Sequence, residues 1–203
     1  IEVSATDLAV DNLGNLFVFT PTGQLKKLSP NGDSIAVYND VRRYGKLYSV
    51  DVSNPLKVLL YYRDYGTVVV LDRLLNMRNS IDLRRLNLLQ VKAIGQAYDN
   101  GIWVFDELEG KIKHIGDDGR VTDQSTDFRQ MFDSMPSPDC IVDQNRSLYL
   151  YDPQKGVYIF DYYGSFRSRV PLLGWHDFTV IANTHQLLVA HPSLPANTVR
   201  ELI

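Results

Sequence analysis

The sequence is poor in the residue types that most often mark catalytic or metal-binding sites. Its 203 residues include one cysteine, Cys140, and only four histidines. A single cysteine excludes an intrachain disulfide, which suits a reducing compartment and equally an extracytoplasmic protein without bridges. Neither a Gly-rich phosphate-binding loop nor a nucleophile elbow nor an HExxH motif occurs. The sequence is therefore more informative about architecture than about a reaction.

Long apolar runs and an excess of positive charge are also missing. No apolar run approaches the roughly 18 residues of a membrane-spanning helix. The 21 basic residues are outnumbered by 24 acidic ones, and the net charge of −3 gives no general attraction for a phosphate backbone. We expect no membrane span and no nucleic-acid partner. Because the chain starts at Ile1 rather than Met, we expect an upstream segment, which could have carried a signal peptide or a lipid anchor.

What the chain does contain is a repeat. An apolar residue followed by Asp occurs four times, and a fifth copy is degenerate: Val10-Asp11, Val50-Asp51, Tyr98-Asp99, Val142-Asp143 and Ile181-Ala182. The steps are separated by 40, 48, 44 and 39 residues. Periods of about 40 to 50 residues are typical of the blades of β-propellers.

Three further strands are predicted after each of the first four apolar-Asp steps, and two after the fifth. The second strands are expected at 16–19, 56–62, 102–105, 148–151 and 187–190. The third strands, opened by Gly in four copies and by Asn197 in the last, are expected at 23–28, 66–71, 110–115, 156–160 and 197–202. Gly and Asn both tolerate the positive φ of a tight turn. Fourth strands are expected at 34–38, 77–83, around 121 and at 166–170.

The fifth copy ends at Ile203 before a fourth strand can form. We expect residues 1–3, which have strand character, to supply that outer strand and so to leave no large open sheet edge. The prediction is an all-β fold with a single β-propeller domain, 1–203, of five four-stranded blades. Their ranges are 5–40, 44–85, 90–126, 137–170, and 175–203 with 1–4. The segment 71–90 could also form a helix, but its Asn and Ser residues favour two strands.

The order VDNLGNLFVF, turn, GQLKKL, turn with Gly resembles the NHL/YVTN-type repeats of β-propellers. The resemblance covers nearly the whole chain, although the fifth copy lacks the Asp. It implies a propeller and leaves the function open, because propellers of this type serve as enzymes, sensors and scaffolds.

The repeated aspartates have two interpretations. Asp11, Asp51, Asp99 and Asp143 could form a carboxylate ring for a hard cation such as calcium. Alternatively, each could cap its own turn, as Asp commonly does. Repetition in every blade favours the caps.

Few other residues suggest chemistry. His176 and His191 lie in connectors of the last blade and could approach each other, but two histidines without a third ligand are weak evidence for zinc. Cys140, beside Ile141 and Val142, is expected to be a small buried apolar residue rather than a nucleophile. We predict no cofactor, no metal site and no catalytic residue.

The connectors carry the residue types that dominate binding hot spots, Arg, Tyr and Trp. In a propeller, the links between blades and the links between second and third strands open onto one face. A short amphipathic helix in 127–136 could plug the channel mouth or dock a partner. The predicted partner-binding residues are Arg42, Arg43, Tyr44, Arg63, Tyr65, Arg84, Arg85, Met131, Phe132 and Trp175. A solvated rim with incidental aromatic residues is the alternative.

These observations favour a non-enzymatic protein-protein interaction module, a scaffold subunit of a larger assembly. The resemblance to this propeller type and the start at Ile1 suggest a bacterial cell envelope, in the periplasm or elsewhere outside the cytoplasm. The alternative is a small-ligand-binding or metal-dependent hydrolase or lyase with a site at the channel mouth, using His176 and His191.

Overall fold

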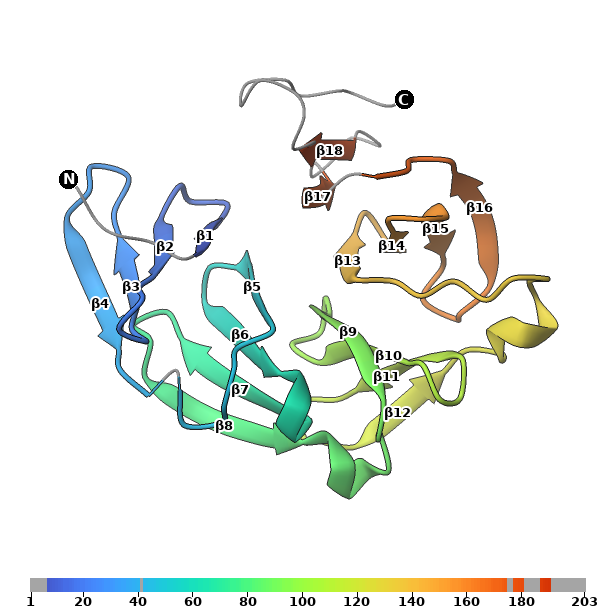
Figure 1. Ribbon diagram of the computed structural model, residues 1–203, viewed down its shortest axis with the longest axis horizontal. Coiled ribbons are helices and arrows are strands. Elements are labelled where there is room, and N and C mark those ends of the chain that lie inside the picture. The colour runs from blue at the N-terminus through green and yellow to red at the C-terminus, as the bar shows by residue number, and fades with distance from the viewer. Residues whose placement is uncertain (1–6, 41, 175–176, 181–186, 191–203) are drawn as a thin grey trace. The chain divides into compact units, whose positions relative to one another are not determined.

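The computed structural model describes residues 7–40, 42–174, 177–180 and 187–190, and the backbone alone at 7, 177–179 and 187–190. The regular elements in these ranges are β-strands and short 3-10 helices (Figure 1). The chain divides into two compact units, Ile1–Leu89 and Gln90–Ile203. Within the described ranges, no helix combines the length and the apolar character that a membrane crossing requires.

The first unit contains two four-stranded sheets. Each is an antiparallel meander, in which every strand pairs with the next one along the chain. The first sheet consists of β1 (Asp7–Val10), β2 (Leu16–Phe19), β3 (Leu25–Leu28) and β4 (Ser34–Tyr38). The second consists of β5 (Ser49–Asn54), β6 (Lys57–Tyr62), β7 (Thr67–Asp72) and β8 (Met77–Asp82). Two 3-10 helices flank strands of this sheet, η1 (Arg63–Tyr65) before β7 and η2 (Leu83–Leu86) after β8.

The second unit repeats this arrangement. One meander is formed by β9 (Val91–Gln96), β10 (Ile102–Asp106), β11 (Lys111–Ile115) and β12 (Val121–Gln124). The next is formed by β13 (Cys140–Gln144), β14 (Ser147–Asp152), β15 (Gly156–Phe160) and β16 (Phe166–Val170). A final pair, β17 (Asp177–Val180) and β18 (Leu187–Ala190), is antiparallel as well.

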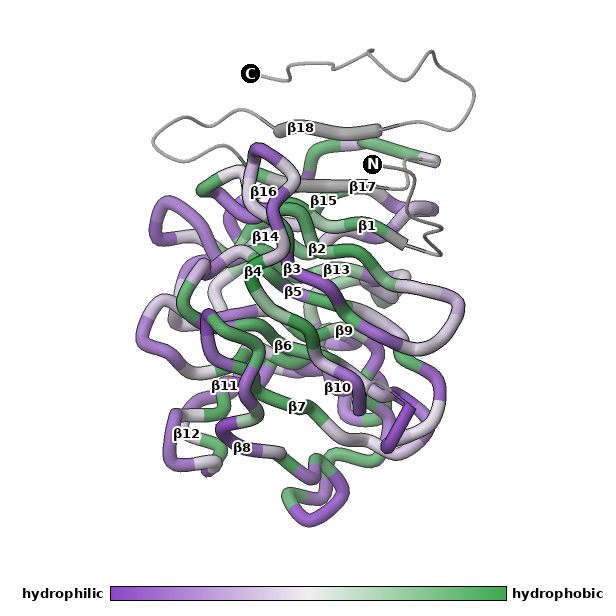
Figure 2. Tube along the Cα trace, turned by 90° about the vertical axis from the view of Figure 1, so that its left-hand side faces the viewer, coloured by the Kyte–Doolittle hydropathy of each residue, from purple (hydrophilic) through white to green (hydrophobic). Residues whose placement is uncertain are grey.

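Burial explains why the middle strands form. Every residue of β6 is buried, and so are five of the six residues of β7, whose sequence TVVVLD is rich in β-branched side chains. The fourth strands β8 and β12 are largely exposed. Figure 2 accordingly shows hydrophobic colours along β6 and β7 and hydrophilic colours along β12. The second and third sheets thus have an apolar centre and a largely exposed outer strand.

The first strands of consecutive sheets within a unit lie side by side. Contacts join β1 to β5, β9 to β13, and β13 to β17. The approach of β9 to β13 depends on Gly95, because a Cβ at that position would lie 2.4 Å from the backbone oxygen of Ile141. Glycine is the residue that permits such a close approach of two backbones.

The glycines before the third strands have the backbone conformation that the sequence predicts. Gly23, Gly66, Gly110 and Gly156 have φ angles of 81°, 61°, 66° and 101°. These values lie in the region that L side chains rarely adopt. The predicted third strand therefore starts at a turn that only glycine makes without strain.

The structure contains the predicted strands of four of the five expected blades. Segment 71–90 contains the end of β7, then β8 and η2, as the two-strand prediction requires. The structure shows four four-stranded sheets, and β17 with β18 as a two-stranded sheet, in its described part. The donated strand at 1–3 and the third strand at 197–202 lie outside the described residues, so the count of five stays a prediction.

The linker 127–136 differs from its prediction. In place of a short amphipathic helix it contains η3 (Phe128–Gln130), a single 3-10 turn that Asp127 caps by accepting a hydrogen bond from the Arg129 N–H. Phe128 is buried, and its ring stacks on that of Phe160 with centroids 4.8 Å apart. We attribute the short turn to this packing, which draws the linker against β15.

Candidate functional site

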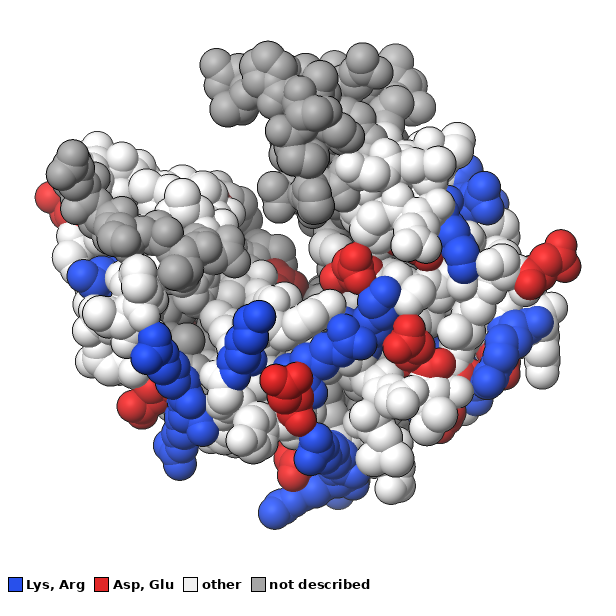
Figure 3. Space-filling model, viewed as in Figure 1, with Lys and Arg blue, Asp and Glu red and all other residues white. Residues whose placement is uncertain are grey.

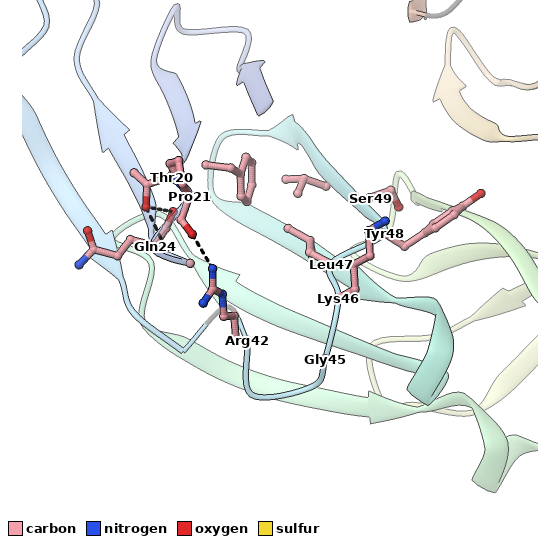
Figure 4. A pocket seen from close by; sticks show the side chains of 12 residues that line it. Thr20, Pro21, Gln24, Arg42, Gly45, Lys46, Leu47, Tyr48 and Ser49 are labelled. Carbon is pink, nitrogen blue, oxygen red and sulfur yellow. Dashed lines mark hydrogen bonds between the residues drawn. The ribbon is translucent and has the colours of Figure 1, made fainter. Parts of the chain in front are cut away.

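An open hollow of about 690 Å³ lies in the first unit, beside the linker between β4 and β5 (Figure 4). Its volume is in the range of small-molecule and side-chain binding pockets in proteins. It is lined by Phe19, Thr20, Pro21, Gly23, Gln24, Arg42, Gly45, Lys46, Leu47, Tyr48, Ser49 and Val50. We call this region the linker hollow.

Arg42 is fixed at one wall of the linker hollow. Its guanidinium donates a hydrogen bond of 2.5 Å to the carbonyl oxygen of Pro21, in the β2–β3 loop. The side chain lies over Gly23, where a Cβ would be 2.7 Å from Arg42 Nε. Glycine at this position therefore permits both the positive φ of the turn and the close packing of the Arg42 side chain.

Tyr48 and Tyr65 are also held in place. The Arg63 guanidinium lies 5.1 Å from the centroid of the Tyr48 ring, and its Nη1 donates to the Tyr48 hydroxyl over 3.3 Å. Tyr61 meets the Tyr48 ring edge-on, with centroids 5.8 Å apart. Tyr65 packs against Gly45, where a Cβ would be 2.7 Å from its ring. Side chains fixed by neighbours in this way lose little conformational entropy when a ligand binds.

The lining of the linker hollow has charge of one sign. Arg42 and Lys46 contribute positive charge, and no Asp or Glu belongs to the lining. Lys46 is exposed and forms no hydrogen bond or ion pair with any residue in the described ranges. In the space-filling view, Lys and Arg side chains lie over the region of the linker and η1, with acidic side chains beside them (Figure 3).

Two of the predicted partner-binding arginines donate hydrogen bonds to loop carbonyl oxygens. Like Arg42, Arg84 donates to a loop carbonyl, that of Asp64, over 2.6 Å, and lies over Gly66. In the second unit Arg129 does the same with Glu109, over 2.8 Å. The acceptors lie 21, 20 and 20 residues before Arg42, Arg84 and Arg129. The sequence analysis missed this repeated contact, because the acceptors are backbone carbonyl groups, which every residue has.

Two other arginines that are predicted to bind a partner, Arg43 and Arg85, are more accessible to one. Arg43 is exposed, and its guanidinium lies 5.5 Å from the centroid of the Tyr44 ring. Tyr44 in turn packs on Tyr62, with centroids 5.5 Å apart. Arg85 forms an exposed ion pair with Asp82 at 3.3 Å. Binding of a partner by these residues stays a prediction, and Trp175 lies outside the described residues.

Met131 and Phe132 belong to the packing of the second unit. Both lie against the core cluster that contains Phe128 and Phe160. The Phe132 ring meets those of Tyr158 and Phe166 edge-on, with centroids 5.1 and 4.9 Å apart. These contacts attach the linker to the fourth sheet, and the prediction that the two residues bind a partner is not tested by them.

The repeated aspartates follow the capping interpretation in three of four cases. Asp11 accepts hydrogen bonds from the backbone N–H groups of Leu13 and Asn15 at 3.0 and 2.9 Å. Asp51 accepts one from Ser53 at 2.8 Å, and Asp99 one from Gly101 at 3.0 Å. Each of these three carboxylates caps its own turn, as the repeat predicts.

Asp143 departs from this pattern. Its carboxylate accepts hydrogen bonds from Trp103 Nε1 at 2.8 Å, from the Tyr98 N–H at 3.1 Å and from the Tyr162 hydroxyl at 2.5 Å. Burial raises the pKa of Asp143, and these hydrogen bonds oppose that effect. Burial also raises the pKa of Tyr162, and its hydrogen bond to Asp143 adds to the effect. The fourth aspartate therefore joins the third and fourth sheets.

A second polar cluster surrounds Ser137, again in the second unit. Lys92 Nζ donates to Ser137 Oγ at 2.7 Å and to its carbonyl oxygen at 2.9 Å, and it pairs with Asp139 at 3.1 Å. Ser137 Oγ donates to Glu107 at 2.8 Å. A serine between a lysine and a carboxylate could suggest a nucleophile, but Lys92 directs its protons at three oxygens and has no lone pair for a base. The cluster holds the segment before β13 in place.

No metal site is apparent in the described part of the chain, where no group of three His, Cys, Asp or Glu side chains is arranged to hold an ion. His114 is buried, with Nδ1 2.6 Å from Thr122 Oγ1 and Nε2 3.1 Å from Asp99 Oδ1. Both of its ring nitrogens are thus engaged by protein. His176 and His191 lie outside the described residues.

Several solved structures resemble this fold. A streptogramin B lyase aligns with a TM-score of 0.61 and 15% identity, over 96% of this chain and 66% of the lyase. The virginiamycin B lyase of Staphylococcus aureus aligns with a TM-score of 0.59 and 9% identity, over 91% of this chain and 61% of that one. A protein of unknown function from Bacteroides caccae aligns with a TM-score of 0.57 and 13% identity, over 93% of this chain and 72% of that one.

Together with the four-stranded meanders, these similarities show that the chain has a β-propeller fold. The chain spans about two thirds of the length of the lyases. Sequence identities this low support a shared fold and say nothing about a shared function. No protein-family model and no curated protein sequence matches the chain. The NHL/YVTN-like repeat type therefore stays a prediction.

Proposed function

We propose that this protein is a non-enzymatic protein-binding module, a scaffold subunit of a larger assembly. The observation that carries the proposal is the linker hollow, an open depression whose aromatic and arginine walls are already fixed. Preformed sites with rigid aromatic and arginine side chains suit protein recognition, because these residues contribute most to binding hot spots.

Exposed residues of the first unit outside the linker hollow are the further candidates for this surface. Arg43 and Arg85 are solvent-accessible cations, and Tyr65 is 56% exposed although its ring edge packs on Gly45. Arg42 and Arg84 are less suitable as test positions, because changing them would also remove their hydrogen bonds to Pro21 and Asp64. A test of partner binding at this surface should therefore substitute Arg43 and Arg85.

The test is affinity capture of the tagged protein from its own cells, followed by mass spectrometry of the retained proteins. We expect partners in fixed ratio with the wild type, and their loss with Arg43→Glu combined with Arg85→Glu. A matched control is Arg78→Glu combined with Arg120→Glu, which reverses two other exposed arginines. Retention of every partner by the first double variant would disprove this surface, and the absence of any partner from the wild type would disprove the module.

The names of two similar structures motivate a second candidate, a small-ligand-binding or metal-dependent lyase that uses His176 and His191. This candidate predicts stoichiometric metal in protein prepared without a chelator. Elemental analysis of the wild type beside His176→Ala and His191→Ala tests it. Metal that is present in the wild type and absent from both variants would favour the lyase over the binding module.

A further inference from the structure

The linker hollow has a charge that contrasts with that of the whole chain. The protein has a net charge of −3, yet the charged residues in the lining of the hollow, Arg42 and Lys46, are both cations. We propose that the linker hollow receives an acidic peptide segment of a partner protein, with an apolar side chain inserted and acidic residues held by Lys46. This inference rests on the proposed function and specifies the partner's chemistry.

Unused hydrogen-bond donors support an anionic occupant. The Lys46 ammonium carries three N–H donors, none of which has an acceptor among the described residues. The Arg42 guanidinium carries five N–H donors, and its hydrogen bond to Pro21 fixes the group while leaving other donors for a ligand. Charge-assisted hydrogen bonds from such groups to carboxylates are about twice as strong as neutral ones.

The floor of the linker hollow supports an apolar anchor. Phe19 is buried, Leu47 and Val50 are half-buried, and all three contribute to the lining. Figure 4 shows Lys46, Leu47 and Tyr48 following one another along the linker, so that the ammonium and the apolar floor belong to one site. A side chain such as Leu or Phe placed there would remove apolar surface from water on both partners.

The open side of the hollow favours a peptide over an enclosed small molecule. Tyr48 is 42% exposed at the lining, and Arg63 holds its ring in position. A chain that crosses the hollow could therefore meet Tyr48 at one point and Lys46 at another. Acidic residues on either side of the anchor would then lie near the cations, whereas basic ones would be repelled.

The experiment is selection from a phage library of random dodecapeptides on immobilised wild-type protein, Lys46→Glu and the control Arg78→Glu. We expect the wild type and the control to enrich peptides that combine Asp or Glu with Leu, Phe or Trp. Fluorescence anisotropy with the leading peptide should show at least a tenfold (~1.4 kcal/mol) weaker affinity for Lys46→Glu. Raising the salt concentration should weaken binding to the wild type, because salt screens exposed charges.

Lys46→Gln provides a second variant, which removes the charge without reversing it and should give an intermediate affinity. Thermal melting verifies that both variants fold. Enrichment of neutral or basic peptides, no enrichment at all, or undiminished affinity in Lys46→Glu would overturn the inference. If Lys46→Glu still captured a partner that the Arg43 and Arg85 variant lost, the inference would be wrong while the proposed function stood.

Discussion

The hydroxyl of Tyr162 donates a hydrogen bond of 2.5 Å to the carboxylate of Asp143. The Tyr162 ring also stacks on that of Tyr98, with centroids 4.6 Å apart and planes inclined by 5°. Trp103 belongs to the third sheet and Tyr98 to its first turn, whereas Asp143 belongs to the fourth sheet and Tyr162 to the turn between β15 and β16. One carboxylate thus orders an aromatic cluster that joins two sheets of the second unit.

Replacing Asp143 should destabilise the second unit. Asp143→Ala would leave the Trp103, Tyr98 and Tyr162 donors without their common acceptor, at a cost of about 2–4 kcal/mol. The measurement is urea unfolding, followed by Trp fluorescence. Asp118→Ala is the control, because Asp118 is exposed and its carboxylate accepts a hydrogen bond from Arg120 within its own turn. Equal effects of the two substitutions would contradict the joining role.

The pH dependence of stability should also report on Asp143. Burial raises its pKa, so within the window that starts at the ordinary value of 3.8 and ends at the raised pKa the folded state binds more protons than the unfolded state. This group's contribution to the unfolding free energy therefore increases as pH falls through that window. Over the same interval, the unfolding free energy of the wild type should rise relative to that of Asp143→Asn. The other titratable groups are common to both proteins, so their pKa shifts cancel in the comparison. A difference that shrinks on acidification would show that the carboxylate is stabilised as an anion.

Lys113 is expected to be essential for the third sheet. Its ammonium contacts Asp106 at 2.8 Å and Glu109 at 3.0 Å, and the Asp106 side chain is only 1% exposed. Lys113→Met would leave a buried carboxylate without its counter-charge, and we expect a loss of about 3 kcal/mol. Lys111→Met is the matched control, since Lys111 pairs with the same Glu109 in a more exposed position and should cost less than about 1 kcal/mol. Thermal unfolding of both variants by circular dichroism distinguishes the two lysines.

Gly95 should not tolerate a side chain. Gly95→Ala places a Cβ against the Ile141 carbonyl oxygen, so β9 and β13 must separate, at about 2–3 kcal/mol. Gly119→Ala is the comparison, because its φ of 76° strains an L residue while nothing lies within 4 Å of the added Cβ. That variant should lose about 1 kcal/mol. Denaturant midpoints of the two variants separate contact from backbone strain, and a milder effect at Gly95 would refute the close approach.

Substitutions of Arg84 and Arg85 should differ in their effect on stability. Arg84→Met removes the hydrogen bond to Asp64 and should lower the unfolding free energy by roughly 0.5–1 kcal/mol. Arg85→Met removes only an exposed ion pair and should leave stability within about 0.5 kcal/mol of wild type. Unfolding curves and affinity capture on the same variants provide the comparison. Loss of stability in Arg85→Met alone would reverse these assignments.

The local features of the fold could be predicted because their causes are local. Alternating apolar residues mark the strands, and Gly at the start of each third strand marks a turn with positive φ. The capping by Asp11 involves residues only two and four positions away, so its role follows from the repeat itself. The strands of four complete sheets were therefore located correctly, whereas the fifth copy extends beyond the described residues.

The sites depend on contacts that no repeat period specifies. Asp143 has the same place in its copy as Asp11, yet its donors Tyr98 and Trp103 lie 45 and 40 residues away. Lys92 reaches Ser137 across 45 residues, and the linker hollow joins β2 with the chain around Lys46. The sequence by itself determined the strands and their turns, because hydrogen bonds between near neighbours and the φ preferences of glycine decide them. Only the tertiary structure decided which side chains meet between sheets, because sheet packing brings together residues that are remote in the chain.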